Sequence, residues 1–138
     1  MKNCSSIDTD DILFQIVSEA VKVGIVKISG IVCPQGERPD NSEAEDIVIN
    51  TITVTHDKPQ SGTSNVNIYA SDQKLKIRGK EQRKADRERL RIIGDALVAY
   101  LDAQNIADLE YWIESDTVIK EAEVKQHYRN IRISWNIH

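Results

Sequence analysis

The side chains that most often carry chemistry are scattered along this chain. His56, His127 and His138 lie far apart, and none belongs to a His-Glu-x-x-His or comparable metal-ligand spacing. Cys4 and Cys33 are isolated in the sequence, and two such cysteines make neither a disulfide framework nor a zinc site. We therefore expect no metal site and no catalytic cysteine.

Motifs for nucleotide or acyl-transfer chemistry do not occur in the sequence. The six glycines are dispersed, so there is neither a phosphate-binding loop nor a Gly-x-Ser-x-Gly turn. Carboxylates at 10–11 and 43–46 are better explained by a helix start and a polar loop than by acid–base catalysis. Glu110, Glu114 and Lys120 could serve a nuclease only if the fold brought them together. The chain is predicted to be no enzyme and to need no cofactor.

Basic side chains gather between residues 74 and 91. Nine basic and three acidic residues give this segment a net charge of +6, whereas the whole chain has a net charge of −4. The segment could be a solvated helix face with i,i+4 ion pairs, an interface for an acidic face of another protein, or a binding site for nucleic acid. No aromatic residue is interleaved, which argues against stacking on single strands. The candidate interface residues are Arg78, Lys80, Arg83, Lys84, Arg87 and Arg91.

The N-terminal third has a helical period followed by alternation. Asp8 is the predicted N-cap of a first helix and Gly24 its stop signal. Alternation over 25–33 then predicts a strand that Pro34 ends, and the polar segment 35–45 predicts a solvated, mobile loop. The apolar stripe that should face the core consists of Ile12, Leu13, Ile16, Val17, Ala20 and Val21.

A hairpin follows, with strands at 46–55 and 65–70 and a polar loop that contains Pro59 and Gly62. The apolar positions change phase near Asn50 and Thr51, which favours a β-bulge or a strand covered on both faces. Side chains that point outward are Asn and Thr rather than nucleophiles or metal ligands. The hairpin therefore indicates pairing and packing.

A long helix is predicted over 82–103, with its apolar stripe at Leu90, Ile93, Leu97 and Leu101. Gly94 within it suggests close packing against the strands. Two last strands are expected at 108–114 and 130–137, and the final strand should lie inside the sheet or along a subunit contact. The segment 116–124 is compatible with a short helix, an irregular connection or an extension of the strand.

These elements predict an α+β fold. Residues 1–138 should form one domain, with two helices on a mixed, mostly antiparallel sheet of about five strands in the order α-β-β-β-α-β-β. No apolar run approaches the roughly 20 residues of a bilayer span, and no secretory signal is visible. We expect no membrane contact and a cytoplasmic location.

Three strand segments resemble those of the tail completion and tail terminator proteins of tailed bacteriophages, small α+β subunits that form a ring at the head–tail junction. The similar order of elements covers most of the chain. The segments are Asp46-Ile47-Val48-Ile49-Asn50, Asn65-Val66-Asn67-Ile68-Tyr69 and His127-Tyr128-Arg129-Asn130-Ile131-Arg132-Ile133.

The resemblance implies a prophage-encoded structural subunit with no catalytic residues. It implies self-association into a ring, with a hexamer expected, and contacts with connector and tail-tube proteins. The location would be the bacterial cytoplasm during assembly and the virion if the protein is phage-encoded. DNA could pass an acidic inner wall without sequence-specific binding, and the loops 35–45 and 56–63 would be candidates for docking onto neighbouring rings.

Two other classes of function are compatible with the sequence. One is a DNA-binding or DNA-processing protein that uses the basic segment 74–91, which salt-dependent DNA binding would identify. The other is a monomeric accessory domain that binds a peptide by strand addition at a sheet edge. Flanking portal, capsid and tail genes would favour the phage interpretation over both.

Overall fold

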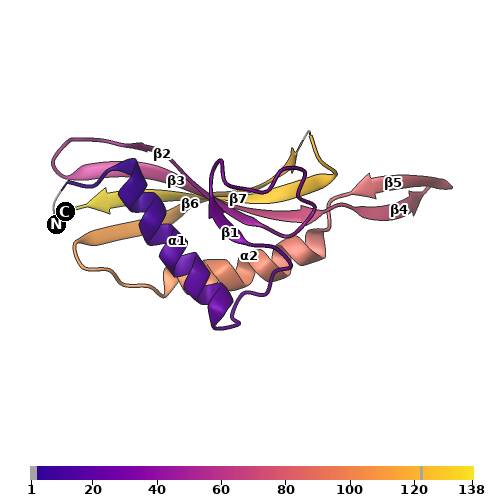
Figure 1. The fold of residues 1–138 in the computed structure, drawn as a ribbon, viewed down its shortest axis with the longest axis horizontal. Coiled ribbons are helices and arrows are strands. Elements are labelled where there is room, and N and C mark those ends of the chain that lie inside the picture. Colours follow the sequence, from indigo (N-terminus) through magenta and orange to yellow (C-terminus); the bar gives the residue numbers. More distant parts are fainter. Residues whose placement is uncertain (1–2, 122) are drawn as a thin grey trace.

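The computed structural model describes residues 3–121 and 123–138, which form two helices and seven strands. In chain order these elements are α1 (Ser6–Lys22), β1 (Val32–Pro34), β2 (Ile47–Val54), β3 (Gln60–Ser71), β4 (Gln73–Ile77), β5 (Lys80–Lys84), α2 (Arg87–Asp102), β6 (Leu109–Glu121) and β7 (Gln126–Ile137). Five strands form the main sheet in the order β1-β2-β3-β7-β6, and β4 pairs with β5 in a separate ribbon that projects from it (Figure 1).

The main sheet is mixed and carries both helices. β1 runs parallel to β2, and the other neighbouring strands are antiparallel. α1 and α2 contribute to one common core with the sheet (Figure 1). The predicted α+β class, with two helices on a five-stranded and mostly antiparallel sheet, is confirmed. The ribbon of β4 and β5 was not predicted.

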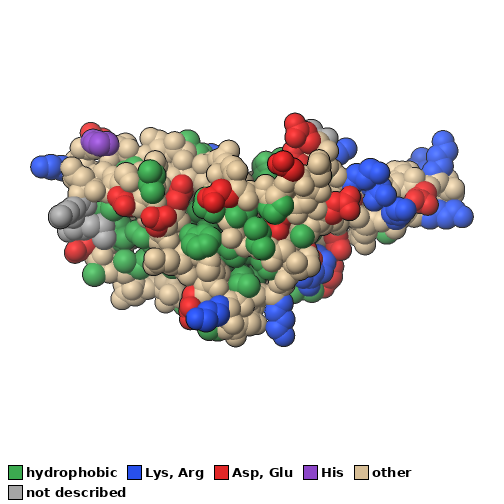
Figure 2. Space-filling view, in the orientation of Figure 1, with side chains coloured by type: hydrophobic (Ala, Val, Ile, Leu, Met, Phe, Trp, Pro, Cys, Tyr) green, Lys and Arg blue, Asp and Glu red, His purple; other side chains and the backbone are tan. Residues whose placement is uncertain are grey.

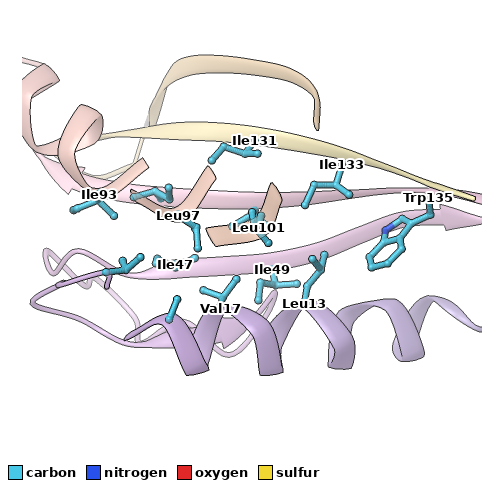
Figure 3. Close-up of a cluster of buried hydrophobic side chains, with 14 of the residues drawn as sticks. Leu13, Val17, Ile47, Ile49, Ile93, Leu97, Leu101, Ile131, Ile133 and Trp135 are labelled. Atoms are coloured by element: carbon cyan, nitrogen blue, oxygen red, sulfur yellow. The ribbon is translucent and has the colours of Figure 1, made fainter. Parts of the chain in front are cut away.

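The core lies between the helices and one face of the sheet. Alternate residues of β2, β3 and β7 point toward the helices, because successive side chains in a strand face opposite sides. Each fully buried aliphatic side chain there contributes about 2 kcal/mol through burial of apolar surface. Figure 3 shows how they meet; the labelled residues are Leu13, Val17, Ile47, Ile49, Ile93, Leu97, Leu101, Ile131, Ile133 and Trp135.

A chain of buried hydroxyl groups attaches α1 to the sheet. Trp135 donates its indole N–H to Ser64 at 2.8 Å, and the Ser64 hydroxyl lies 2.7 Å from that of Thr51. The Thr51 hydroxyl in turn lies 2.7 Å from that of Thr9, which donates to the Ser6 carbonyl of α1. Each polar group in this chain has a partner, so its burial carries no penalty for an unmade hydrogen bond.

The first helix begins three residues earlier than its predicted N-cap. Ser5 is the N-cap and Asp8 is the third helical residue, and the two form a capping box in which each side chain binds the other's backbone N–H. The prediction of Asp8 as N-cap was therefore wrong by one turn. Gly24 follows the C-cap with a φ of +83°, which confirms it as the stop signal.

The first predicted strand is much shorter than 25–33. The backbone N–H groups of Ile25 and Val26 bind the carbonyl of Ala20 and keep this stretch at the end of α1, not in the sheet. Pairing with β2 is confined to Val32–Pro34. A side chain at Gly30 would collide with Asp46 and the Glu45 backbone, so the chain passes here too closely for a larger residue.

The predicted hairpin and its bulge are present. β2 and β3 pair antiparallel, with a register shift between Thr51 and Thr53 that leaves Ile52 exposed and returns Val54 to the core side. The bulge lies about one residue beyond the predicted position. The loop predicted over 56–63 ends earlier than expected, because β3 begins at Gln60 and includes Gly62. A Cβ at Gly62 would approach the Thr53 carbonyl at 3.0 Å.

The second helix begins at Arg87, not at residue 82. β5 continues to Lys84, and Asp86 then caps α2 by accepting from the backbone N–H of Arg89. The predicted apolar stripe of this helix is buried. Gly94 packs against the side chain of Arg129 on β7, which confirms the expected close packing against the strands.

The last two strands pair along almost their whole length. β6 continues through Glu121, so of the three alternatives for residues 116–124 the strand extension is correct up to that residue, and residue 122 lies outside the described part. β7 lies between β3 and β6, which confirms that the final strand is inside the sheet. Within the described residues, no helix is both long enough and apolar enough to span a membrane.

Candidate interaction surfaces on the ribbon and the open sheet edge

The ribbon consists of β4, β5 and the turn between them, residues 73–84, and is here called the basic ribbon. The turn residues Arg78 and Gly79 have φ values of +50° and +78°, as expected of a two-residue turn that matches the twist of a hairpin. Both strands are exposed along their length, apart from half-buried Gln82. The ribbon extends well beyond the end of the main sheet (Figure 1).

The two faces of the basic ribbon differ in character. The register pairs Leu75 with Gln82 and Ile77 with Lys80, so both apolar side chains lie on the same face. Leu75 is 39% exposed and Ile77 is 36% exposed. The opposite face carries Lys74 and Lys76 with their partners from β5. The face of Leu75 and Ile77 also carries Lys80 and Lys84, so the ribbon is basic on both faces and its two apolar side chains are partly exposed.

The basic ribbon carries six cationic side chains and one carboxylate, Glu81, which gives a net charge of +5. Glu81 lies 3.6 Å from Lys74, and both side chains are mostly exposed. Figure 2 shows the Lys and Arg side chains gathered on the ribbon, whereas Asp and Glu are spread along the body. Among residues 3–121 and 123–138, the structure gives no ion pair to the six candidate interface residues.

The six candidate interface residues occupy two places. Arg78, Lys80, Arg83 and Lys84 are on the ribbon, whereas Arg87 and Arg91 are in the first turns of α2. Arg87 and Arg91 line a hollow of about 290 Å³ between α2 and β6, together with Leu90, Asp95, Asp116, Val118 and Arg129. The helix predicted over 82–103 would have held Arg83 and Lys84 together with Arg87 and Arg91, but β5 continues to Lys84 and places the first two on the ribbon.

The base of the ribbon is held against the body. The Asp72 carboxylate lies 2.6 Å from Nδ1 of His127, and the Asp72 backbone N–H donates to the Lys125 carbonyl at 2.9 Å. The Asp72 side chain is almost fully buried. Since Asp72 is the single residue between β3 and β4, these contacts make the ribbon a continuation of β3 with a defined direction.

The outer side of β6, here called the open edge, is the second candidate surface. β6 is a 13-residue strand that pairs with β7 and, within the described residues, with no strand on its other side. Residues 108–121, which are β6 and the residue before it, include five carboxylates and one lysine, a net charge of −4. Trp112, Val118 and Ile119 are exposed there. Long, uncovered edges of this kind can pair with another chain.

Arg129 ties the open edge to α2. Its guanidinium donates to both carboxylate oxygens of Asp116, at 2.8 and 2.7 Å, and to Asp95 at 2.9 Å. The same group donates to the Leu90 carbonyl at 3.2 Å. Hydrogen bonds to Asp116 and Asp95 raise the pKa of Arg129 against the opposing effect of burial. Arg129 therefore has a structural role and stays charged.

The loop 35–45 covers part of the sheet face that carries no helix. The Arg38 guanidinium lies 3.8 Å from the centre of the Tyr69 ring and donates to Asp46 at 2.9 Å. Burial raises the pKa of Asp46, but hydrogen bonds from Ser42, Arg38 and the Ile31 N–H outweigh it and lower that pKa overall. The expectation of a mobile, solvated loop was wrong at these anchoring residues, since a buried cluster holds them to the sheet.

The remaining candidate residues do not form one site. His127 binds Asp72, His138 lies 3.5 Å from Glu110, and Cys4 and Cys33 are buried and free of disulfides. Burial raises the pKa of both thiols. Among the described residues, no group of three or more His, Cys, Asp and Glu side chains could hold a metal ion.

The residues considered for a nuclease lie on different faces of the sheet. Lys120 pairs with His127, in the same alternation as the core residue Ile131, so it is on the helix side. Glu110 pairs with Asn136, which belongs to the opposite alternation. The strand therefore separates the lysine from Glu110 instead of bringing them together.

Sequence reasoning missed the ribbon, although its signal is present. Lys74-Leu75-Lys76-Ile77 alternates as a strand does, and Arg78-Gly79 is a plausible hairpin turn. The open edge was also missed, because the periodicity of a single segment does not show which strands become its neighbours in the sheet. No protein-family model matches this chain, and no curated protein sequence is significantly similar to it.

Proposed function

We propose that this protein is a structural assembly subunit of a tailed-phage or prophage head–tail junction, where copies of it form a ring that completes or terminates the tail. The observation that carries the proposal is that one chain bears two different, complementary open surfaces, the basic ribbon and the acidic open edge. Contacts between two unlike surfaces of identical subunits produce rings when the rotation closes.

The resemblance to tail completion and terminator proteins supports the same proposal. The three segments that carry it lie in β2, β3 and β7, which are neighbours at the centre of the main sheet. The ring, for which a hexamer is expected, would contact connector and tail-tube proteins during assembly in the bacterial cytoplasm and in the virion. DNA would pass through it without sequence-specific binding.

The loops 35–45 and 55–59 are candidates for docking onto the neighbouring rings. The first has an exposed tip between its anchors at Arg38 and Asp46, and the second connects β2 to β3 and is mostly exposed. If either loop docks, shortening its tip should abolish binding to a connector or tail-tube protein without unfolding the sheet. Unchanged binding would remove that loop from the proposal.

Deletion of the gene from an inducible prophage tests the proposed function. We expect heads and tails to accumulate unjoined, or tails of abnormal length, and electron microscopy of lysates to show this. Portal, capsid and tail genes should flank the gene. Normal joined virions after deletion, or a gene neighbourhood without such genes, would overturn the proposal.

Binding of DNA is the second candidate function, because, of the six ribbon cations, only Lys74 has a carboxylate partner, Glu81, within the described part of the chain. Clustered cations that release counterions from phosphate bind DNA with a strong dependence on salt. Reversal of Arg83, Arg87 and Arg91 to Glu should abolish such binding. A third possibility is a monomer that binds a peptide along β6 by strand addition.

A further inference from the structure

The two apolar side chains of the basic ribbon, Leu75 and Ile77, are only partly covered by residues 3–121 and 123–138. A two-stranded hairpin is at best marginally stable alone in water, and burial of an apolar face on another layer is what usually stabilises it. Leu75 and Ile77 are more than a third exposed and lie side by side on one face. The ribbon is therefore suited to contact a second molecule.

The ribbon is held away from its own open edge. Asp72 fixes the direction in which β3 continues into β4, through His127 and the Lys125 carbonyl. The ribbon extends past the end of the sheet instead of lying along β6 (Figure 1). Bending it back onto its own sheet would break the buried contacts of Asp72.

The open edge is complementary to the ribbon in charge and offers backbone groups for pairing. It is acidic where the ribbon is basic, with net charges of −4 and +5, and this complementarity favours contact between two copies. It exposes Trp112 and Ile119 on the face away from the helices and Val118 on the helix side, beside a row of unpaired backbone groups. At the opposite edge of the sheet, β1 is three residues long and ends in Pro34, so it offers little to pair with.

We propose that the basic ribbon of one copy docks on the open edge of β6 in the next copy, extends that sheet, and covers Leu75 and Ile77 against the exposed apolar side chains of β6. The occupant of the open edge is thus a second copy of this chain in a head-to-tail contact. This inference rests on the proposed function, because it names the surfaces through which the ring would form.

Disulfide trapping between two variants, each with one added cysteine, tests the contact. One variant carries Leu75→Cys and the other Val118→Cys; the native cysteines are buried and slow to react. Mixing the two variants under mild oxidation should give a cross-linked pair, and neither variant should cross-link with itself. A cross-link between two ribbons, or between two open edges, would show symmetric pairing and overturn the proposal, as would no cross-link at protein concentrations up to about 1 mM.

Charge reversal gives an independent test without cysteines. A ribbon variant, Lys80→Glu with Lys84→Glu, lowers the net charge of the ribbon from +5 to +1, and an edge variant, Glu110→Lys with Glu114→Lys, raises that of residues 108–121 from −4 to 0. Each alone should associate about tenfold or more weakly than the original chain, measured by sedimentation, because the attraction between ribbon and edge is lost. An equimolar mixture should regain association as pairs, since the unchanged ribbon of the edge variant still meets the unchanged edge of the ribbon variant.

The matched control is Glu37→Lys with Asp40→Lys, which changes the net charge as the edge variant does but in the exposed part of the loop 35–45. It should associate like the original chain. Equal weakening in this control, or a mixture that fails to regain association, would overturn the proposal. Binding of a DNA duplex through the ribbon without self-association would overturn it as well.

The tests separate this inference from the proposed function. Rings without the cross-link between residues 75 and 118 would leave the head–tail function standing and remove the docking mode. Cross-linked filaments, in a protein whose deletion leaves virions normal, would keep the docking mode and remove the proposed function.

Discussion

The body of the molecule and the basic ribbon use strands of similar alternation in opposite ways. In β2, β3 and β7, alternate residues are buried under the helices, whereas β4 and β5 are exposed apart from half-buried Gln82. Alternation alone therefore does not show whether a strand supports a core. The difference teaches that the body carries the stability of this protein, whereas the ribbon is available for contact with other molecules.

The largest effect on stability is expected inside the core of the body. Leu97 is fully buried between α2 and the sheet. Leu97→Ala should lower the free energy of unfolding by about 4 kcal/mol, through lost burial and the cavity left behind. Urea unfolding at low protein concentration measures it. Ile52→Ala at the exposed bulge is the control and should cost less than about 1 kcal/mol.

Loss of a buried charge should come next. The Asp46 side chain is 2% exposed and accepts hydrogen bonds from Arg38, Ser42 and Ile31. Asp46→Asn should cost about 3 kcal/mol, because Arg38 keeps its charge in a partly buried place without its partner. The exposed Asp40→Asn serves as control in the same urea measurement. Equal stability of the two variants would show that the cluster contributes little.

Gly94→Ala should destabilise the body by about 2 kcal/mol, because a Cβ at this position collides with the Arg129 side chain. The effect should change sign when Arg129 is already replaced by Ala. Without the collision, alanine gains about 1 kcal/mol over glycine in a helix interior. A double-mutant cycle in thermal unfolding measures both. Destabilisation that persists without Arg129 would contradict this account of the packing.

Acid should weaken the body through Glu45 and Asp46. A hydrogen bond from Arg89 lowers the pKa of Glu45, and the pKa of Asp46 is also lowered. A carboxyl group with a depressed folded-state pKa stabilises the protein fully above its unfolded-state pKa, here above about pH 5, and loses that contribution as pH falls through the folded-state pKa. The urea concentration at the unfolding midpoint should therefore decrease when the pH is lowered below about 4. The decrease should be smaller in Asp46→Asn.

The smallest effect on stability is expected in the ribbon. Leu75→Ser should change the free energy of unfolding of the isolated chain by less than about 0.5 kcal/mol, because this side chain is 39% exposed and lies outside the core of the body. Self-association, however, should weaken strongly. Urea unfolding and sedimentation on the same sample compare the two quantities. A large loss of stability at low concentration would mean that the ribbon belongs to the fold of the body.

Much of the body could be predicted from local pattern. The stripes that contain Leu13 and Val17 in α1, and Ile93 and Leu97 in α2, are buried as expected because a 3.6-residue period places them on one face. Errors occurred where a distant group decides. Ile25 and Val26 belong to an alternating segment that predicts a strand, but their backbone N–H groups bind the Ala20 carbonyl. Residues 82–86 were predicted to be helical, but β5 continues to Lys84 and Asp86 is the N-cap of α2.

The candidate surfaces were less predictable than the fold. The six basic residues were identified from charge, because cations cluster visibly in a sequence. Their division between the ribbon and α2 was not, since it depends on the turn at Arg78 and Gly79. The loop 35–45 looked solvated because its residues are polar, and only the position of Tyr69 shows that Arg38 has a ring to cover.

The sequence by itself determined the α+β class, the apolar faces of the two helices, the pairing of β2 with β3, and the basic character of residues 74–91. These features depend on side-chain period and charge, which are local. Only the tertiary structure decided that β6 stands at an edge while β7 is enclosed, that Asp72 holds the base of the ribbon, and that the Arg129 side chain lies against position 94. Such features depend on which distant segments become neighbours, and no single segment carries that information.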